Sequence, residues 1–148
     1  MQLRNKINHH FFDISKMASI KISGLDQFMH ENLMWERTLN FYKQENSFLK
    51  TRLSQVVDNN TDKEFVEQAE HYQNIFLFKD EYIKELCQDI RMQLELIKNA
   101  VPGNALHMNA MTKMQDKLRT EMEKFEMDFS IQKNEFNKKL VSYILTIN

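Results

Sequence analysis

The most constraining feature of this sequence is a pair of apolar positions that repeats every seven residues between Leu25 and Val56. Its members are Leu25, Phe28, Trp35, Leu39, Tyr42, Leu49, Leu53 and Val56. This spacing keeps the apolar side chains on one side of a helix and predicts that the helix packs against neighbours along its length. The only glycines and the only proline of the chain, Gly24, Pro102 and Gly103, stand where long periodic segments begin or end. We therefore expect a few long helices.

The first helix is expected over residues 25–58. Ser23 offers a capping oxygen before Gly24, and Asp26 places an acid in the first turn, where the helix dipole is positive. Three turn-forming residues, Asp58, Asn59 and Asn60, follow and are expected to end the helix.

The second helix is expected over residues 62–100. Thr61 and Glu64 form the pattern of a capping box, in which the hydroxyl and the carboxylate each satisfy a backbone donor. The main apolar stripe of this helix is Phe65, Ala69, Tyr72, Phe76, Ile83, Leu86, Ile90 and Ile97, flanked by Ile75, Tyr82, Leu94 and Leu96. Because this face is wider than a two-stranded seam requires, the helix is expected to lie between two neighbours.

The third helix is expected over residues 104–146, after the break at Pro102 and Gly103. Its apolar residues recur on average near every 3.6 positions: Met111, Met114, Leu118, Met122, Phe125, Phe129, Phe136, Leu140, Tyr143 and Ile147. Loops at about 59–61 and 101–104 are so short that consecutive helices must reverse direction. The predicted fold class is all-α, an elongated antiparallel three-helix bundle roughly 50 to 60 Å long.

Residues 1–23 are expected to form an N-terminal arm or a short fourth helix, and residues 24–148 the helical bundle domain. Leu3, Ile7, Phe11, Ile14 and Ala18 could line one helical face. The adjacent Phe11 and Phe12 are expected to dock on this chain or on another. Exposing both to water is unfavourable by a few kcal/mol, at roughly 25 cal/mol per Å².

The charge balance argues against nucleic acid and membrane as partners. The 20 Lys and Arg residues nearly cancel the 21 Asp and Glu residues, so no broad basic surface is expected. No apolar run has the length of a signal peptide or of a transmembrane helix. Cys87 is the single cysteine, which excludes an intrachain disulfide. Its apolar neighbours predict a buried thiol that acts as a small hydrophobic residue, and a reducing cytoplasm fits best.

Metal and catalytic motifs are weak. Asp26 with His30 and Glu67 with His71 are each four residues apart, so each pair shares a helix face where two ligands could reach one ion. Antiparallel folding would separate the pairs by about 30 Å, so they cannot form one centre. No glycine-rich phosphate loop or nucleophile elbow is present. We expect no cofactor, no metal and no enzymatic activity.

Polar residues interrupt the apolar stripes at Asn32, Asn46, Lys79 and Gln93. Buried polar groups at such positions fix the register and the number of helices, at a cost in stability. The alternative is that these positions lie at solvent-covered edges of the seams. If the hairpin turns at residue 60, Asn46 is expected to form a hydrogen bond with Tyr72.

Part of the chain resembles an uncharacterised group of small all-helical bacterial proteins. The residues that carry the resemblance are His30, Trp35, Phe41, Tyr42, Lys43, Glu45, Arg52, Leu53, Glu70, His71, Tyr72, Gln73 and Asn74. The resemblance implies a helical protein from a bacterial cytoplasm, and it implies no activity.

The sequence thus predicts a non-enzymatic module for protein–protein interaction or structure, which binds itself or another helical partner. Large apolar residues outnumber what a thin three-helix seam can bury, so some should form an interface. The interface candidates are Phe11, Phe12, Phe48, Phe78, Met34 and Met92, with Phe48 and Phe78 preferred because both lie off the main stripes. The alternative function is a bundle that binds a metal, haem or small ligand between its helices.

Overall fold

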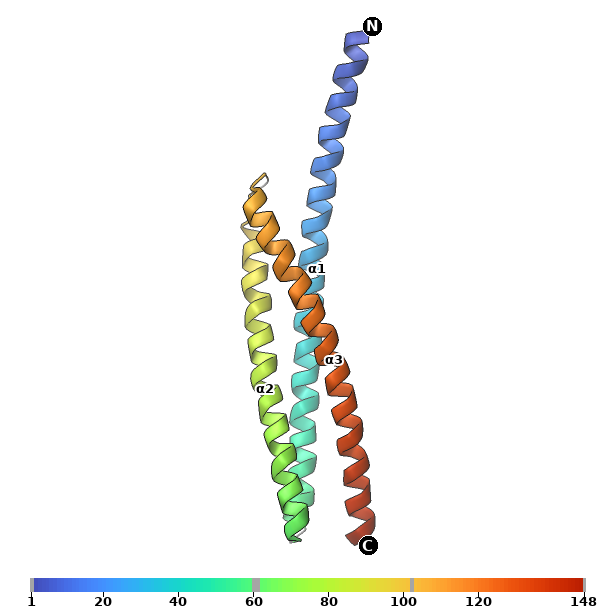
Figure 1. Cartoon of the computed structure of the whole chain (residues 1–148), viewed down its shortest axis with the longest axis vertical. Helices are drawn as coiled ribbons and strands as arrows, with labels where there is room; N and C mark the ends of the chain where they lie inside the picture. Colours follow the sequence, from blue (N-terminus) through green and yellow to red (C-terminus); the bar gives the residue numbers. More distant parts are fainter. Residues whose placement is uncertain (1, 60–61, 102, 148) are drawn as a thin grey trace.

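The chain forms three helices that fold back on one another: α1 (Gln2–Asp58), α2 (Lys63–Lys98) and α3 (Ala105–Ile147). The computed structural model describes the backbone of residues 2–59, 62–101 and 103–147, and the side chains of residues 24–59, 62–101 and 103–144. Every element in the described backbone is a helix. Figure 1 shows α2 running back along α1 and α3 returning beside both. The predicted all-α three-helix bundle is confirmed.

Helix α1 is much longer than expected. It begins at Gln2 and spans 57 residues, or about 85 Å. The prediction that Ser23 caps a helix starting at 25 is wrong, and residues 2–23 continue α1 instead of forming a separate fourth helix. A single interior glycine such as Gly24 costs only about 1 kcal/mol relative to alanine, which does not end a helix by itself. The N-terminal part of α1 extends past α2 and α3 (Figure 1).

The reversal between α1 and α2 ends at Asp62. The Asp62 carboxylate accepts a hydrogen bond from the backbone N–H of Glu64 at 3.4 Å, which caps α2. Thr61, the expected capping residue, lies outside the described residues. Helix α2 therefore starts one residue later than predicted.

The second reversal uses asparagines at both helix ends. The backbone N–H of Asn99 donates to the carbonyl of Glu95 at 3.1 Å and closes α2. Gly103 has a φ of 94°, a conformation that side chains with a Cβ rarely adopt. The Asn104 side chain then accepts from the backbone N–H of His107 at 3.4 Å and caps α3.

The core is a heptad seam shared by the three helices. Its buried apolar side chains are Leu39, Leu49 and Leu53 from α1; Phe65, Ala69, Phe76, Ile83, Leu86, Ile90, Leu94 and Ile97 from α2; and Met111, Leu118, Met122, Phe125, Phe129, Phe136 and Leu140 from α3. The predicted stripes are confirmed except at two positions: Leu96, expected to flank the α2 stripe, is 49 % exposed, and the side chain of Ile147 lies outside the described residues. No described helix contains an apolar stretch long enough to cross a membrane.

Aromatic rings lie between α3 and the other two helices in the half of the bundle that contains the α1–α2 reversal. Tyr42 of α1 packs edge-on against Phe125 and Phe129, with ring centroids 5.4 and 4.7 Å apart. Phe76 of α2 meets Phe136 at 5.0 Å. The backbones of α1 and α2 approach each other most closely. Helix α3 lies farther from both, because the large aromatic side chains stand between its backbone and theirs.

The residues that interrupt the stripes are buried. Asn32 and Asn46 are 0 % exposed, Gln93 is 1 % exposed and Lys79 is 7 % exposed, so the alternative of solvent-covered edges is wrong. The expected bond between Asn46 and Tyr72 is also wrong. The Asn46 amide donates instead to the Phe76 carbonyl at 2.8 Å and to the Asp80 carboxylate at 2.7 Å.

The observed partners of Asn46 lie about one helical turn farther along α2 than Tyr72. The expected pairing assumed that the chain reverses at residue 60, but α2 begins only at Lys63, so the reversal is centred later in the sequence. Lys50 also pairs with Asp80, so a polar cluster of Asn46, Lys50 and Asp80 fixes the α1–α2 register.

A second buried cluster joins all three helices. The Asn32 amide of α1 donates to the Gln115 side-chain oxygen of α3 at 2.7 Å, and the Gln93 amide of α2 donates to the same oxygen at 3.2 Å. Gln93 also donates to the Met111 carbonyl at 2.8 Å. We call Asn32, Gln93 and Gln115 the amide layer. Gln115, which is 0 % exposed, was missed from the sequence.

Charged pairs align α3 with α1 outside the core. The Arg119 guanidinium donates two hydrogen bonds to the Glu31 carboxylate, at 2.7 and 2.5 Å, and this pair raises the pKa of Arg119. Farther along, Lys133 donates to Glu45 at 2.6 Å. Both pairs join residues 88 positions apart, so α1 and α3 run parallel in constant register.

Replacing Gln115 by alanine is expected to lower the free energy of unfolding by about 2 to 4 kcal/mol. The substitution removes the shared acceptor of two buried amides and leaves a cavity at the centre of the bundle. Gln88→Ala, at an exposed position of α2, is the control and should change stability by less than about 0.5 kcal/mol. Urea denaturation followed by circular dichroism measures both, and equal stabilities of the two variants would contradict this role for the amide layer.

Candidate functional site

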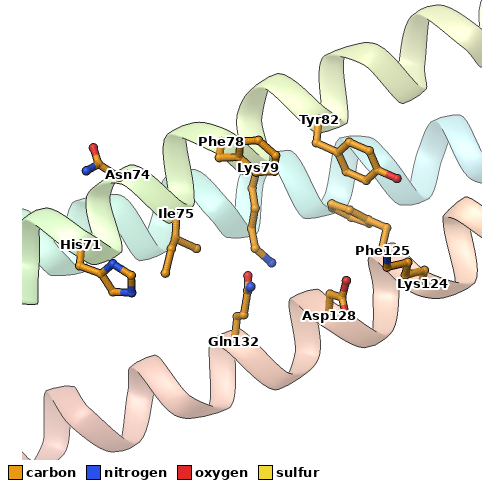
Figure 2. Close-up of a pocket in the computed structure, with 10 residues that line it drawn as sticks. All are labelled: His71, Asn74, Ile75, Phe78, Lys79, Tyr82, Lys124, Phe125, Asp128 and Gln132. Carbon is orange, nitrogen blue, oxygen red and sulfur yellow. The ribbon is translucent and has the colours of Figure 1, made fainter.

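A groove of about 500 Å³ opens between α2 and α3. Figure 2 shows the ten side chains that line it: His71, Asn74, Ile75, Phe78, Lys79 and Tyr82 from α2, and Lys124, Phe125, Asp128 and Gln132 from α3. The α2 residues recur three or four positions apart and so share one helix face. The groove lies where the aromatic part of the core spaces these two helices.

Lys79 is the most unusual residue of the groove. It occupies a core position of the α2 heptad and is only 7 % exposed. Its ammonium nitrogen lies 4.5 Å from the ring centroid of Phe129 and 5.9 Å from that of Phe125, which allows cation–π attraction. None of the described side chains gives this ammonium a hydrogen bond or an ion pair within 4 Å.

The surroundings of Lys79 disfavour its charge. Burial lowers the pKa of Lys79 from 10.5 to about 8, while the carboxylate of Asp128 opposes part of this shift. An ammonium has three N–H donors, and without a hydrogen-bond partner among the described side chains much of this capacity is unused.

Gln132 faces Lys79 across the groove. Figure 2 shows the Lys79 side chain extending from α2 toward Gln132 of α3, with Asp128 one turn away. The side-chain oxygen of Gln132 is buried and has no hydrogen-bond partner among the described residues. Gln132 belongs to the α3 heptad and was missed from the sequence, although its spacing from Phe125, Phe129 and Phe136 marks the position.

A second feature is an apolar stripe on the outer side of α1. Met34, Phe41 and Phe48 are each seven residues apart and are 50, 56 and 58 % exposed. We call these three residues the α1 stripe. Arg52, which contacts Asn137 of α3 at 3.1 Å, covers the Phe48 ring at 5.9 Å. The α1 stripe therefore borders the α1–α3 side of the bundle, whereas Phe78 borders the α2–α3 side.

The predicted interface candidates have distinct placements. Phe48, Phe78, Met34 and Met92 are all exposed, with Phe78 at 74 % and Met92 at 65 %. The side chains of Phe11 and Phe12 lie outside the described residues. Phe41 completes the α1 stripe and was not among the candidates, although its seven-residue spacing from Met34 and Phe48 is visible in the sequence.

The four weak metal candidates do not come together. Asp26, His30, Glu67 and His71 are all exposed, and the first pair lies near the amide layer while the second lies near the α1–α2 reversal. Among residues with described side chains, no group of three or more His, Cys, Asp or Glu is placed to hold a metal ion. His71 instead lines the groove.

Cys87 is half-buried against the core. Burial raises the pKa of its thiol, and the nearby Arg91 opposes part of that effect. The thiolate is the nucleophilic form of cysteine, so this environment disfavours nucleophilic chemistry at Cys87.

Comparisons with known proteins add no assignment, since no family model, no curated protein and no solved structure matches the chain.

The lowered pKa of Lys79 predicts a pH-dependent stability. Between about pH 8 and 10.5 the unfolded chain binds more protons at this position than the native protein, so the free energy of unfolding rises with pH. The rise from pH 8 to 10 should be about 2 kcal/mol at 1.36 kcal/mol per pKa unit. Above pH 10 the raised pKa values of Tyr42 and Tyr82 oppose the trend.

Lys79→Met, which nearly preserves side-chain volume, should remove this rise, while Lys84→Met at an exposed α2 position should keep it. Urea denaturation at pH 8, 9 and 10 makes the comparison. Parallel pH profiles of wild type and Lys79→Met would show that the Lys79 ammonium is not desolvated in the native state.

Proposed function

We propose that this protein is a non-enzymatic helical interaction module that self-associates through the α1 stripe. The observation that supports this proposal most strongly is the uninterrupted seven-residue spacing of three large exposed side chains, Met34, Phe41 and Phe48. Exposed apolar residues scattered singly are ordinary, whereas a contiguous patch is typical of an interaction site. Burying a Phe or Met side chain contributes about 1.5 to 3 kcal/mol.

The seven-residue spacing favours a helix as the partner. A heptad repeat keeps its members on one line of a supercoiled helix, as in the seams of coiled coils. Met34 and Phe48 lie 14 positions apart, or about 21 Å along the helix. By contrast, the corresponding line on α2 is broken, because Glu85 stands midway between Phe78 and Met92.

The α1 stripe is self-complementary. In an antiparallel pairing of two α1 helices centred on Phe41, Met34 of each copy faces Phe48 of the other, as a twofold interface requires. The same arrangement brings Glu31 near Arg52 of the other copy. Both residues lie on the α3 side of the stripe, where Glu31 contacts Arg119 and Arg52 contacts Asn137. Opposite charges thus flank the apolar contact.

A bacterial cytoplasm is part of this proposal. A lone cysteine fits a compartment where structural disulfides are rare. The resemblance of the segment around Trp35 and Tyr42 to small bacterial helical proteins also supports it.

Replacing both phenylalanines of the α1 stripe by glutamate (F41E/F48E) should convert a dimer into a monomer and leave the helix content unchanged. In the pair, the two carboxylates introduced at position 41 would face each other and each carboxylate introduced at position 48 would be placed against Met34 of the other copy, which buries charge in the contact. Both positions are more than half exposed in the single chain. Sedimentation equilibrium measures the mass, and circular dichroism measures helicity.

Two variants provide matched controls for F41E/F48E. Met127→Glu is at a position on α3, outside the α1 stripe, that is 65 % exposed, and Phe78→Glu is at the groove. Both should keep the dimer mass. A monomeric wild type, or an F41E/F48E mass equal to that of wild type, would overturn the proposal.

A further inference from the structure

We propose that the α2–α3 groove binds a small monocarboxylate with an apolar body, whose carboxylate pairs with Lys79. This inference is independent of self-association through α1. It begins from a polar group that the fold leaves without a partner: the Lys79 side chain is only 7 % exposed, its ammonium borders the groove beside the rings of Phe129 and Phe125, and no described side chain gives it a hydrogen bond or an ion pair. Buried charges in proteins are normally paired or hydrogen-bonded.

A second unsatisfied group lies opposite. The Gln132 side-chain oxygen is buried and unpartnered, and Figure 2 shows Gln132 and Lys79 facing each other across the groove. The N–H₂ of the same amide is a donor at the lining of the groove. Lys79 and Gln132 would then both donate to one carboxylate.

The charged residues that line the groove favour a ligand with a single negative charge. Lys79 and Lys124 contribute two positive charges, and Asp128 contributes one negative charge. The remaining net charge of +1 matches a monoanion. A dianion such as a phosphate monoester would meet the Asp128 carboxylate with a surplus charge, which costs free energy.

The walls of the groove select an apolar body for the ligand. Ile75, Phe78, Tyr82 and Phe125 supply aliphatic and aromatic surface beside the polar pair. A volume of about 500 Å³ falls in the range of small-molecule sites, which combine apolar walls with a few polar groups. Phe78, exposed at the rim to 74 %, would be covered by the ligand body.

Decanoate and 4-phenylbutyrate serve as probes, one with an alkyl body and one with an aryl body. Both are titrated into the full chain below the micellar concentration and are followed by ¹H–¹⁵N NMR. At least one should shift the amide signals around Phe78, Phe125 and Gln132 with saturable binding. Decanol, which keeps the chain and lacks the charge, should bind at least tenfold more weakly than decanoate.

Substitutions assign the binding to the polar pair. Lys79→Met should weaken carboxylate binding at least tenfold, and Gln132→Leu should weaken it severalfold. Lys79→Arg should restore part of the affinity, which separates charge pairing from altered folding. Lys84→Met, at an exposed α2 position away from the groove, should bind as wild type does.

Three results would overturn the inference: no saturable shift with either carboxylate, equal affinity for decanoate and decanol, or wild-type affinity in Lys79→Met. Loss of self-association in F41E/F48E would leave the carboxylate titration unchanged, so failure of either proposal is distinguishable from failure of the other.

Discussion

The structure depends on how three apolar seams are held in one register, and buried amides supply that constraint. Apolar side chains at heptad positions attract without direction, so a shift of α3 by one heptad would again place apolar residues in the seam. Hydrogen bonds join particular donors and acceptors, so they do not tolerate such a shift. Within the amide layer, one oxygen of Gln115 accepts from both Asn32 and Gln93, so α1, α2 and α3 meet at a single height. If α3 slid, the Gln115 oxygen would lose both donors and the Gln93 amide would lose its partners on α3, at a cost of about 1 to 3 kcal/mol for each buried group left unpaired.

Register then determines both candidate sites. With α3 fixed beside α1, the rings of Phe125 and Phe129 fall beside Lys79, and the groove opens where these rings space α3 from α2. The same packing directs the heptad seam of α1 inward and leaves Met34, Phe41 and Phe48 outside. The same arrangement of helices thus turns the Lys79 ammonium toward the groove without an ion-pair partner among the described residues and leaves the α1 stripe exposed on the outside. These are the two features that are unusual for a structure that serves packing alone.

The sequence predicts the seams well, because a seven-residue repeat reports directly which side of a helix is buried. It also identified Asn32, Asn46, Lys79 and Gln93 as interruptions, and all four are buried. Gln115 and Gln132 were not predicted, because an average apolar spacing of about 3.6 residues does not distinguish the polar members of a heptad from solvent-facing positions. The partner of Asn46 was wrong by one turn, since it depends on where the chain reverses. The groove could not be predicted, because it lies between two segments about 50 residues apart along the chain. Its shape also depends on the orientations of aromatic rings, which the spacing of apolar residues does not determine.

The register itself can be measured by chemical cross-linking between α1 and α3. In a background in which Cys87 is replaced by serine, cysteines at Glu31 and Arg119, whose long side chains meet between the helices, should be joined within one chain by a short bismaleimide reagent that spans about the reach of the two original side chains. Cysteines at Glu31 and Glu126, one heptad farther along the same face of α3, should not. Equal cross-linking of both pairs, or preferential cross-linking of the second pair, would contradict a bundle whose register is fixed by its buried amides.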